Sequence, residues 1–102
     1  MKLAVLGAGS WGLTLASMLE NNFDDIYVWG RKEDFTPDFL ATKKKTYPIE
    51  VQLPMKTVLT QSMEEAISDA EIILLVVSTA GTRPVCELVK NAGVKPNQII
   101  VN

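Results

Sequence analysis

The chain has 102 residues, of which 47% are hydrophobic, and a formal net charge of −2. This balance is typical of one globular domain, and the slight acidity argues against nucleic-acid binding, which requires many Lys and Arg residues on one face. The chain has no histidine and a single cysteine, Cys86, which excludes an internal disulfide, histidine-based catalysis and a zinc site, so no metal is expected.

The first predicted element is a strand over residues 2–6, built on an apolar run. Gly7 ends that run far below the length of a signal sequence, and no later run is long enough to cross a membrane. We therefore expect a cytoplasmic protein without membrane insertion.

A glycine-rich segment, G-A-G-S-W-G from Gly7 to Gly12, joins this strand to a helical pattern. Gly7 suits a tight turn, a bare backbone at Gly9 lets a pyrophosphate approach, and Gly12 lets the helix pack on the sheet. Because the helix N-terminus offers unpaired N–H groups and a positive dipole end, it can hold an anionic dinucleotide. Trp11 either caps this crevice or packs against a neighbouring domain. The apolar spacing predicts one buried helix face: Gly12, Leu15, Ala16, Leu19 and Phe23.

The second strand is predicted over residues 26–29, which closes a β-α-β unit of about thirty residues, the size typical of a dinucleotide-binding fingerprint. An NAD-specific site would place Asp or Glu at the end of this strand, against the ribose 2′-hydroxyl. Arg31 and Lys32 stand there instead, and guanidinium groups bind phosphate oxygens in a bidentate way. We predict that NADP(H) binds at least as well as NAD(H). Two points stay open: both cations fit a solvated strand end as well, and Glu33 is close by.

Prolines interrupt the stretch between residues 30 and 57, for which we predict an irregular connection with a short helix over 34–42. Its basic run, Lys43 to Lys45, is interpreted as a solvated loop. A third strand is predicted over 58–60. Ser62 and Glu65 fit a capping box that starts the next helix.

Six apolar residues at 72–77 predict a central parallel strand that is covered on both faces. Ser78, which follows it, either contacts a cofactor or starts a turn. Pro84 suits the first turn of another helix and Gly93 its end. On that helix we interpret Cys86 as a buried, inert thiol. A fifth strand is predicted over 99–101.

The alternation of strands and helices predicts an α/β fold, a doubly wound parallel sheet of the Rossmann type with strand order 3-2-1-4-5. The ligand crevice should then lie at the carboxyl ends of strands one and four. Because 102 residues is short for a dehydrogenase, we expect residues 1–102 to be a truncated dinucleotide-binding domain with an incomplete sheet. An exposed apolar edge on such a sheet favours self-association, for example as a homodimer.

The wording V-L-G-A-G-S-W-G, followed by V-W-G-R after the second strand, resembles the bacterial-type NAD(P)-dependent glycerol-3-phosphate dehydrogenases. Tyr47, the pair Leu53-Pro54 and the segment from Ser68 to Val85 are similar to further motifs of that family. Two loops depart from its pattern, at residues 48–50 and at Val77-Ser78. By position, the resemblance implies that Ser10, Trp11 and Arg31 contact the cofactor, NADP or NAD, with Lys32 beside them.

The resemblance also implies a parent enzyme that interconverts dihydroxyacetone phosphate and sn-glycerol 3-phosphate and supplies glycerophospholipid synthesis. The family's catalytic lysine and substrate-phosphate groups belong to a helical C-terminal domain. We therefore expect no catalytic residue in this chain, substrate contact only through that other domain, and no dehydrogenase activity from these residues alone. The alternatives are another small-molecule reductase of this fold, such as ketopantoate reductase, and a non-catalytic nucleotide-sensing module, which typically carries an acid where Arg31 stands.

Overall fold

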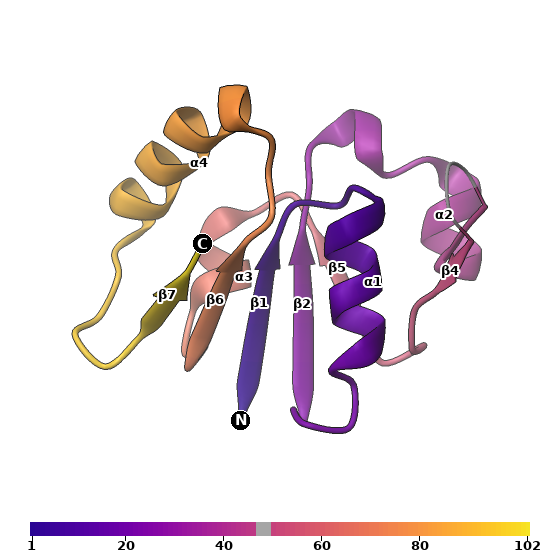
Figure 1. Cartoon of the computed structure of the whole chain (residues 1–102), viewed down its shortest axis with the longest axis horizontal. Helices are drawn as coiled ribbons and strands as arrows, with labels where there is room; N and C mark the ends of the chain where they lie inside the picture. The colour runs from indigo at the N-terminus through magenta and orange to yellow at the C-terminus, as the bar shows by residue number, and fades with distance from the viewer. Residues whose placement is uncertain (47–49) are drawn as a thin grey trace.

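Five parallel strands form the central sheet in the order β5-β2-β1-β6-β7 (Figure 1). The structure is a computed structural model that describes residues 1–46 and 50–102. The strands are β1 (Lys2–Leu6), β2 (Asp25–Trp29), β5 (Val58–Thr60), β6 (Ile72–Leu75) and β7 (Ile99–Val101). Counted among the predicted strands only, this order is 3-2-1-4-5, so the predicted doubly wound arrangement is confirmed.

The middle of the sheet is apolar on both sides. All residues from Leu3 to Leu6 are fully buried, as a strand covered on two faces requires. Leu3 pairs in register with Ile26 of β2 and with Ile72 of β6. Alternate residues of β1 therefore belong to two separate core clusters, one on each face of the sheet.

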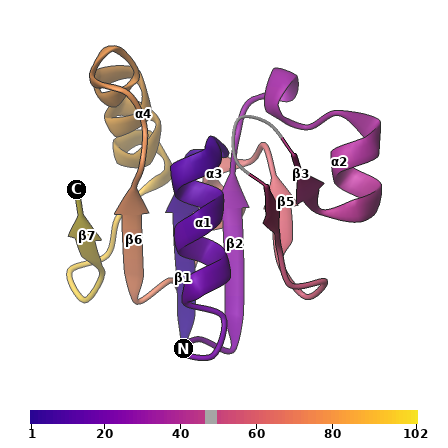
Figure 2. The ribbon, with the colours of Figure 1, turned by 45° about the vertical axis from the view of Figure 1, so that its right-hand side comes forward.

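Helices cover both faces of the sheet, but not evenly. Helix α1 (Ser10–Met18) lies over β1 and β2 on one face, whereas α3 (Met63–Ile67) and α4 (Thr79–Ala92) lie on the other (Figures 1 and 2). Ile73 of β6 is fully buried, whereas Ile72 and Leu74, which pack against the cluster on the α1 side, and Leu75 on the other side are only partly buried. Residues of β6 thus pack on both faces of the sheet, as expected, but the cover is incomplete.

The buried face of α1 differs from the predicted one. Gly12, Leu13 and Ala16 are buried, while Leu15 is only partly buried. A Cβ atom on Gly12 would lie 2.2 Å from the Gly7 carbonyl oxygen, so this close approach sets the rotation of the helix. The helix ends at Met18, and Phe23 is buried from the loop that leads into β2.

The connection after β2 is more ordered than expected. The 3-10 helix η1 (Lys32–Asp34) and helix α2 (Pro37–Thr42) replace the single helix predicted over 34–42. Two short strands follow, β3 (Lys44–Lys45) and β4 (Val51–Gln52), which pair antiparallel. This hairpin packs beside α1, where the Ser17 hydroxyl donates to the Gln52 carbonyl at 3.4 Å (Figure 2). Tyr47 and the departure at 48–49 lie outside the described residues.

In the second half of the chain, the end of one strand, the start of one helix and the burial of one residue differ from the predictions. Strand β6 ends at Leu75 rather than at residue 77, close to the point where Gly7 turns the neighbouring chain out of the sheet. Helix α4 begins at Thr79, so Pro84 lies inside it rather than in its first turn. Val85 and Val89 take the buried positions of α4, and Cys86 is exposed, contrary to our interpretation.

The capping box predicted at the start of α3 is half formed. The Ser62 hydroxyl accepts a hydrogen bond from the Glu65 N–H at 3.2 Å. The Ser62 N–H does not close the box with the Glu65 side chain, because it donates to the Thr60 hydroxyl at 3.0 Å. Within the described residues, no helix is long and apolar enough to cross a membrane.

Candidate functional site

The glycine-rich loop lies at the carboxyl end of β1, where the chain passes from the sheet into α1 (Figure 1). Gly7 has a φ of +136°, and its N–H donates to the Trp29 carbonyl at 2.9 Å. A Cβ atom there would lie 2.1 Å from the Val76 carbonyl oxygen. Gly7, like Gly12, is therefore required by the packing of the protein itself.

Gly9 is different, because nothing in the described fold requires a glycine there. Its φ of −76° and ψ of 174° are open to any residue. A Cβ atom built on it would meet no atom within 4 Å, and the residue is exposed. The bare backbone at Gly9 therefore leaves open space in front of the helix N-terminus.

The N-terminus of α1 is well suited to an anion. Its first N–H groups have no acceptor one turn earlier within the helix, and Gly9 supplies no capping side chain. The first turn contains no acidic residue that would offset the positive end of the helix dipole. Unpaired N–H groups and the dipole therefore act together on the space that Gly9 leaves open.

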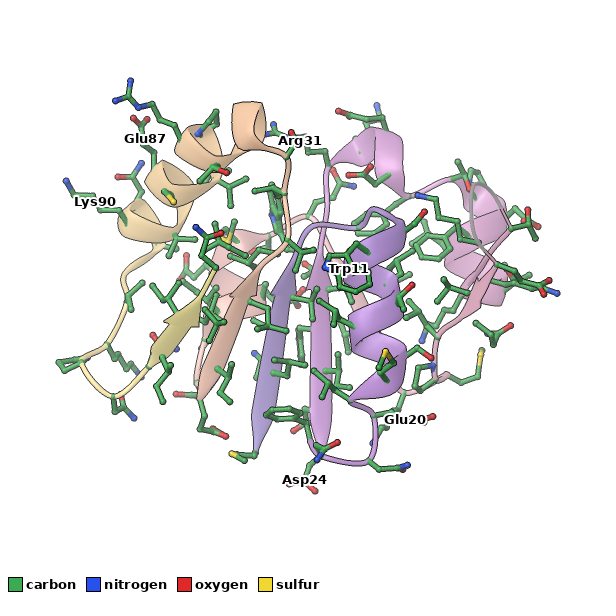
Figure 3. The ribbon with its side chains drawn as sticks, viewed as in Figure 1. Trp11, Glu20, Asp24, Arg31, Glu87 and Lys90 are labelled. Atoms are coloured by element: carbon green, nitrogen blue, oxygen red, sulfur yellow. The ribbon has the colours of Figure 1, made fainter. Side chains whose placement is uncertain are left out.

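A hollow of about 490 Å³ lies beside this helix N-terminus, on the face of β6 and β7 that α1 leaves uncovered. Trp11 is 64% exposed and stands in front of the sheet at the edge of the hollow (Figure 3). The floor of the hollow is the apolar segment from Leu74 to Val77, which is followed by the exposed Ser78. The lining residues are Gly9, Ser10, Trp11, Gly12, Leu15, Leu74, Leu75, Val76, Val77, Ser78, Val101 and Asn102. Predicted residues from the loop and from the end of β6 thus share one concavity.

The end of β2 forms a second part of the site. Arg31 and Lys32 are exposed, and Arg31 lies near the carboxyl ends of the strands (Figure 3). The Arg31 guanidinium carbon lies 5.7 Å from the centroid of the Trp29 ring. Neither cation is among the residues that line the 490 Å³ hollow. Arg31 and Lys32 therefore lie at the end of β2, apart from the predicted residues of the glycine-rich loop.

A carboxylate also stands at the end of β2, and the sequence analysis did not single it out. The Asp34 carboxylate accepts a hydrogen bond from the Arg31 N–H at 2.8 Å, closing the turn formed by η1. It lies 3.2 Å from where a Cβ atom on Gly30 would be. A capping side chain commonly lies three residues from the N–H group whose hydrogen bond it accepts. The spacing of Asp34 from Arg31 could therefore have indicated this contact.

The interpretation of the basic run as a solvated loop is wrong for most of it: Lys43 is partly buried and its Nζ atom donates to the Met55 carbonyl, and Lys44 and Lys45 form β3. Lys44 is exposed and pairs with Glu50 at 3.2 Å. Lys45 is partly buried, and its Nζ atom donates to the Ala8 carbonyl of the glycine-rich loop at 3.3 Å. No local sequence signal reveals this contact, because it depends on the path of the β3–β4 hairpin.

Shifted pKa values occur at the opposite end of the sheet. The Met1 amino group and the Asp24 carboxylate are 2.6 Å apart, and their hydrogen bond raises the pKa of the amino group and lowers that of the carboxyl group (Figure 3). Burial lowers the pKa of Lys2, whose Nζ atom lies 3.8 Å from the centroid of the Tyr27 ring. These are surface contacts at the amino ends of the strands. No group of three or more possible metal ligands occurs among the residues that the structure describes.

Comparison with known sequences gives a family match over nearly the whole chain. The family model described as NAD-dependent glycerol-3-phosphate dehydrogenase N-terminus matches residues 2–102. The glycerol-3-phosphate dehydrogenase [NAD(P)+] of Thermoanaerobacter sp. (strain X514) is 31% identical over 102 residues, which cover 100% of this chain and 31% of that protein. The enzyme of the same name from Bacillus thuringiensis (strain Al Hakam) is 38% identical over 91 residues, covering 87% of this chain and 26% of that protein. The chain thus spans less than a third of the length of these relatives.

Solved structures agree on the fold. A PanE/ApbA family ketopantoate reductase from Ralstonia eutropha JMP134 matches with a TM-score of 0.78 at 21% identity, over 100% of this chain and 33% of that one. A glycerol-3-phosphate dehydrogenase from Saccharomyces cerevisiae matches with a TM-score of 0.78 at 18% identity, over 98% of this chain and 32% of that one. At these identities the likeness establishes the Rossmann-type fold and does not distinguish between the two activities.

Proposed function

The chain belongs to the family of NAD-dependent glycerol-3-phosphate dehydrogenase N-termini, and we propose that residues 1–102 are the domain that binds NAD(P)(H) in such an enzyme. One observation carries this proposal: Gly9 leaves open space in front of unpaired N–H groups at the start of α1, although neither its conformation nor its packing requires glycine. An incoming diphosphate supplies the missing reason, because only a bare backbone lets it approach the N–H groups closely.

The other predicted residues fit around that position. Ser10 and Trp11 would hold the cofactor at the mouth of the hollow, and Ser78 would contact it from the end of β6. Arg31 and Lys32 would bind the adenosine end, because the ribose 2′ position of a dinucleotide lies at the end of the second strand. Gly7 and Gly12 act indirectly by setting the shape of the loop.

The test of this assignment compares two nucleotides. Arg31→Ala should weaken NADPH binding by about tenfold, the effect expected when a charge-assisted hydrogen bond is lost, and should change NADH binding much less. Lys90→Ala is the matched control, since Lys90 is an exposed cation on the outer side of α4 (Figure 3). Isothermal titration of both nucleotides would check it. Equal losses for NADPH and NADH would remove Arg31 from the 2′ position, and no binding of either nucleotide to the wild type would refute the proposed function.

The activity proposed for the parent enzyme is the interconversion of dihydroxyacetone phosphate and sn-glycerol 3-phosphate, in line with the names of the curated relatives. The nicotinamide, when bound, supplies the hydride. This chain's residues orient the cofactor, while the groups that bind substrate and move the proton would come from the rest of the parent. We place this reaction in the cytoplasm and in the supply of glycerophospholipid synthesis.

Family membership favours this function over the two alternatives. A sensing module or a ketopantoate reductase shares the fold, but the family model that matches residues 2–102 is that of the glycerol-3-phosphate dehydrogenases. We also propose that the exposed edge strand β7 promotes self-association of the chain, as a homodimer or a larger species.

A further inference from the structure

Lys45 brings a positive charge to the glycine-rich loop from a distant part of the chain. Its Nζ atom donates to the Ala8 carbonyl at 3.3 Å, and the residue is partly buried. An ammonium group has three N–H donors, so this contact leaves two of them available. Among residues 1–46 and 50–102, Lys45 forms no ion pair with an acidic side chain, in contrast to its neighbour Lys44.

The position of Lys45 favours contact with the ribose 2′ substituent of a dinucleotide over contact with its diphosphate. A Cβ atom on Gly30 would lie 2.8 Å from the Ala8 Cβ, so the Ala8 contact is next to the end of β2. Lys45 also lines a cavity of about 280 Å³ with Glu33 and Asp34, which follow that strand end, and it does not line the hollow beside Gly9 and Ser10. In this fold the diphosphate lies at the helix N-terminus, whereas the ribose 2′ substituent lies at the end of the second strand.

The cavity carries charges of both signs, so a phosphate group there would need cations close beside it. The acidic residues in its lining are Glu33, Asp34 and Asp38, and the basic ones are Lys44 and Lys45; the Asp34 carboxylate already accepts the Arg31 N–H at 2.8 Å. A 2′-phosphate next to these carboxylates requires cations to offset the repulsion. Arg31 and Lys32 offer them from the strand end, and Lys45 offers one from the hairpin on the side of Ala8.

We propose that Lys45 is a specificity-determining residue that contacts the 2′-phosphate of NADP(H). This inference rests on the proposed function, because it assumes that a dinucleotide binds along the glycine-rich loop. It adds a residue from the β3–β4 hairpin to a site whose predicted members all come from the loop and from the ends of β2 and β6.

The experiment compares Lys45→Gln with Lys90→Gln, a control at an exposed lysine of α4 that lines neither the hollow beside Gly9 nor the cavity beside Glu33. Isothermal titration with NADPH, NADH, 2′,5′-ADP and 5′-AMP separates the 2′-phosphate from the rest of the cofactor. Lys45→Gln should weaken NADPH and 2′,5′-ADP by about tenfold, the loss expected for one charge-assisted contact, and leave NADH and 5′-AMP nearly unchanged. Lys90→Gln should leave all four unchanged, and Lys45→Arg should retain most of the NADPH affinity.

A measurement on the wild type avoids any effect of the substitution on folding. Reductive methylation followed by peptide mass spectrometry should show that 2′,5′-ADP protects Lys45 and not Lys90, and that 5′-AMP protects neither. Unchanged NADPH affinity in Lys45→Gln, equal losses for NADPH and NADH, or equal methylation of Lys45 with both probes would overturn the inference. If the wild type binds NADPH and NADH but Lys45 is indifferent, the proposed function stands; if it binds neither, both fall.

Discussion

Gly9 differs from Gly7 and Gly12 in what it does for the protein. A Cβ atom at either of those two positions would lie little more than 2 Å from a backbone oxygen, whereas Gly9 meets nothing within 4 Å. The two kinds of glycine therefore separate folding from binding, although all three belong to one sequence motif.

This difference gives a prediction at Gly9. Gly9→Ala should change the free energy of unfolding by less than about 1 kcal/mol, because the new methyl group meets open space. The same substitution should weaken NADPH and NADH alike by about tenfold or more, since the methyl group would crowd the approaching diphosphate. Urea unfolding and nucleotide titration would measure the two effects.

Gly7→Ala is the control, and it should be strongly destabilising, because its Cβ atom would lie 2.1 Å from a carbonyl oxygen in a left-handed region of the backbone. Wild-type nucleotide affinity in Gly9→Ala would show that no ligand group approaches this part of the backbone.

Thr57 offers a prediction on stability alone. Its side chain is fully buried, and its hydroxyl oxygen has no hydrogen-bond partner among the described residues. Valine has nearly the same shape without the hydroxyl group, so Thr57→Val should raise the free energy of unfolding by about 1 kcal/mol. Thr60 is the matched control, because it is also buried but its hydroxyl accepts the Ser62 N–H at 3.0 Å.

Thr60→Val should therefore lower the free energy of unfolding by about 1 kcal/mol, the cost of a lost buried hydrogen bond. Comparing the urea denaturation midpoints of the two variants with that of the wild type would test both predictions. Destabilisation by Thr57→Val would indicate that its hydroxyl group has a partner in solution.

At the scale of elements, apolar runs in the sequence predicted the strands of the central sheet, whereas the shortest elements were not predicted. The strands over 2–6, 26–29, 58–60 and 99–101 and their order follow from runs of apolar and β-branched residues. The hairpin of β3 and β4 was missed, because strands of two residues are too short to show alternation. Pro84 led to a wrong start for α4, since proline lacks the N–H that would donate to the preceding turn and normally stands in the first turn, whereas here it is the sixth residue of the helix.

In the candidate site too, residues next to long strands could be predicted from the sequence, whereas a residue on a short element could not. Sequence alone located the glycine-rich loop, Ser78 and the cations after β2, because each adjoins the end of a predictable strand. Sequence could not locate Lys45, since its contact with Ala8 depends on how an irregular connection folds back over the loop. That these residues bind a nucleotide stays a prediction, to be decided by the titrations above.

At the scale of the whole molecule, the strand order concentrates the candidate functions at one end of the sheet. The chain leaves β1 toward one side and β6 toward the other, so the crevice opens between their carboxyl ends. The ion pair of Met1 and Asp24 lies at the opposite end, where the sheet presents its amino ends (Figure 3). Substitutions there should affect stability without altering the crevice.

The edge strand β7 leads to a last prediction, on association. Ile99, Ile100 and Val101 are each at least 45% exposed, and β7 pairs only with β6 among the described strands. An exposed, apolar edge strand is a template for pairing with another chain. For a polypeptide of residues 1–102, we therefore expect sedimentation velocity to show a species larger than a monomer whose share grows with protein concentration. Ile99→Lys should abolish it, because a charged side chain on an edge strand opposes pairing.

Met18→Lys is the control, since Met18 is 69% exposed on α1 and the substitution adds the same charge away from the edge. It should associate as the wild type does, whereas equal loss of association in both variants would show that the substitution does not act through β7. The edge also predicts the dependence on salt. Because pairing of an apolar edge depends on burial and backbone hydrogen bonds rather than on opposite charges, raising the ionic strength should not dissociate the wild-type species. A strictly monomeric wild type at all concentrations, or dissociation by salt, would contradict association through β7.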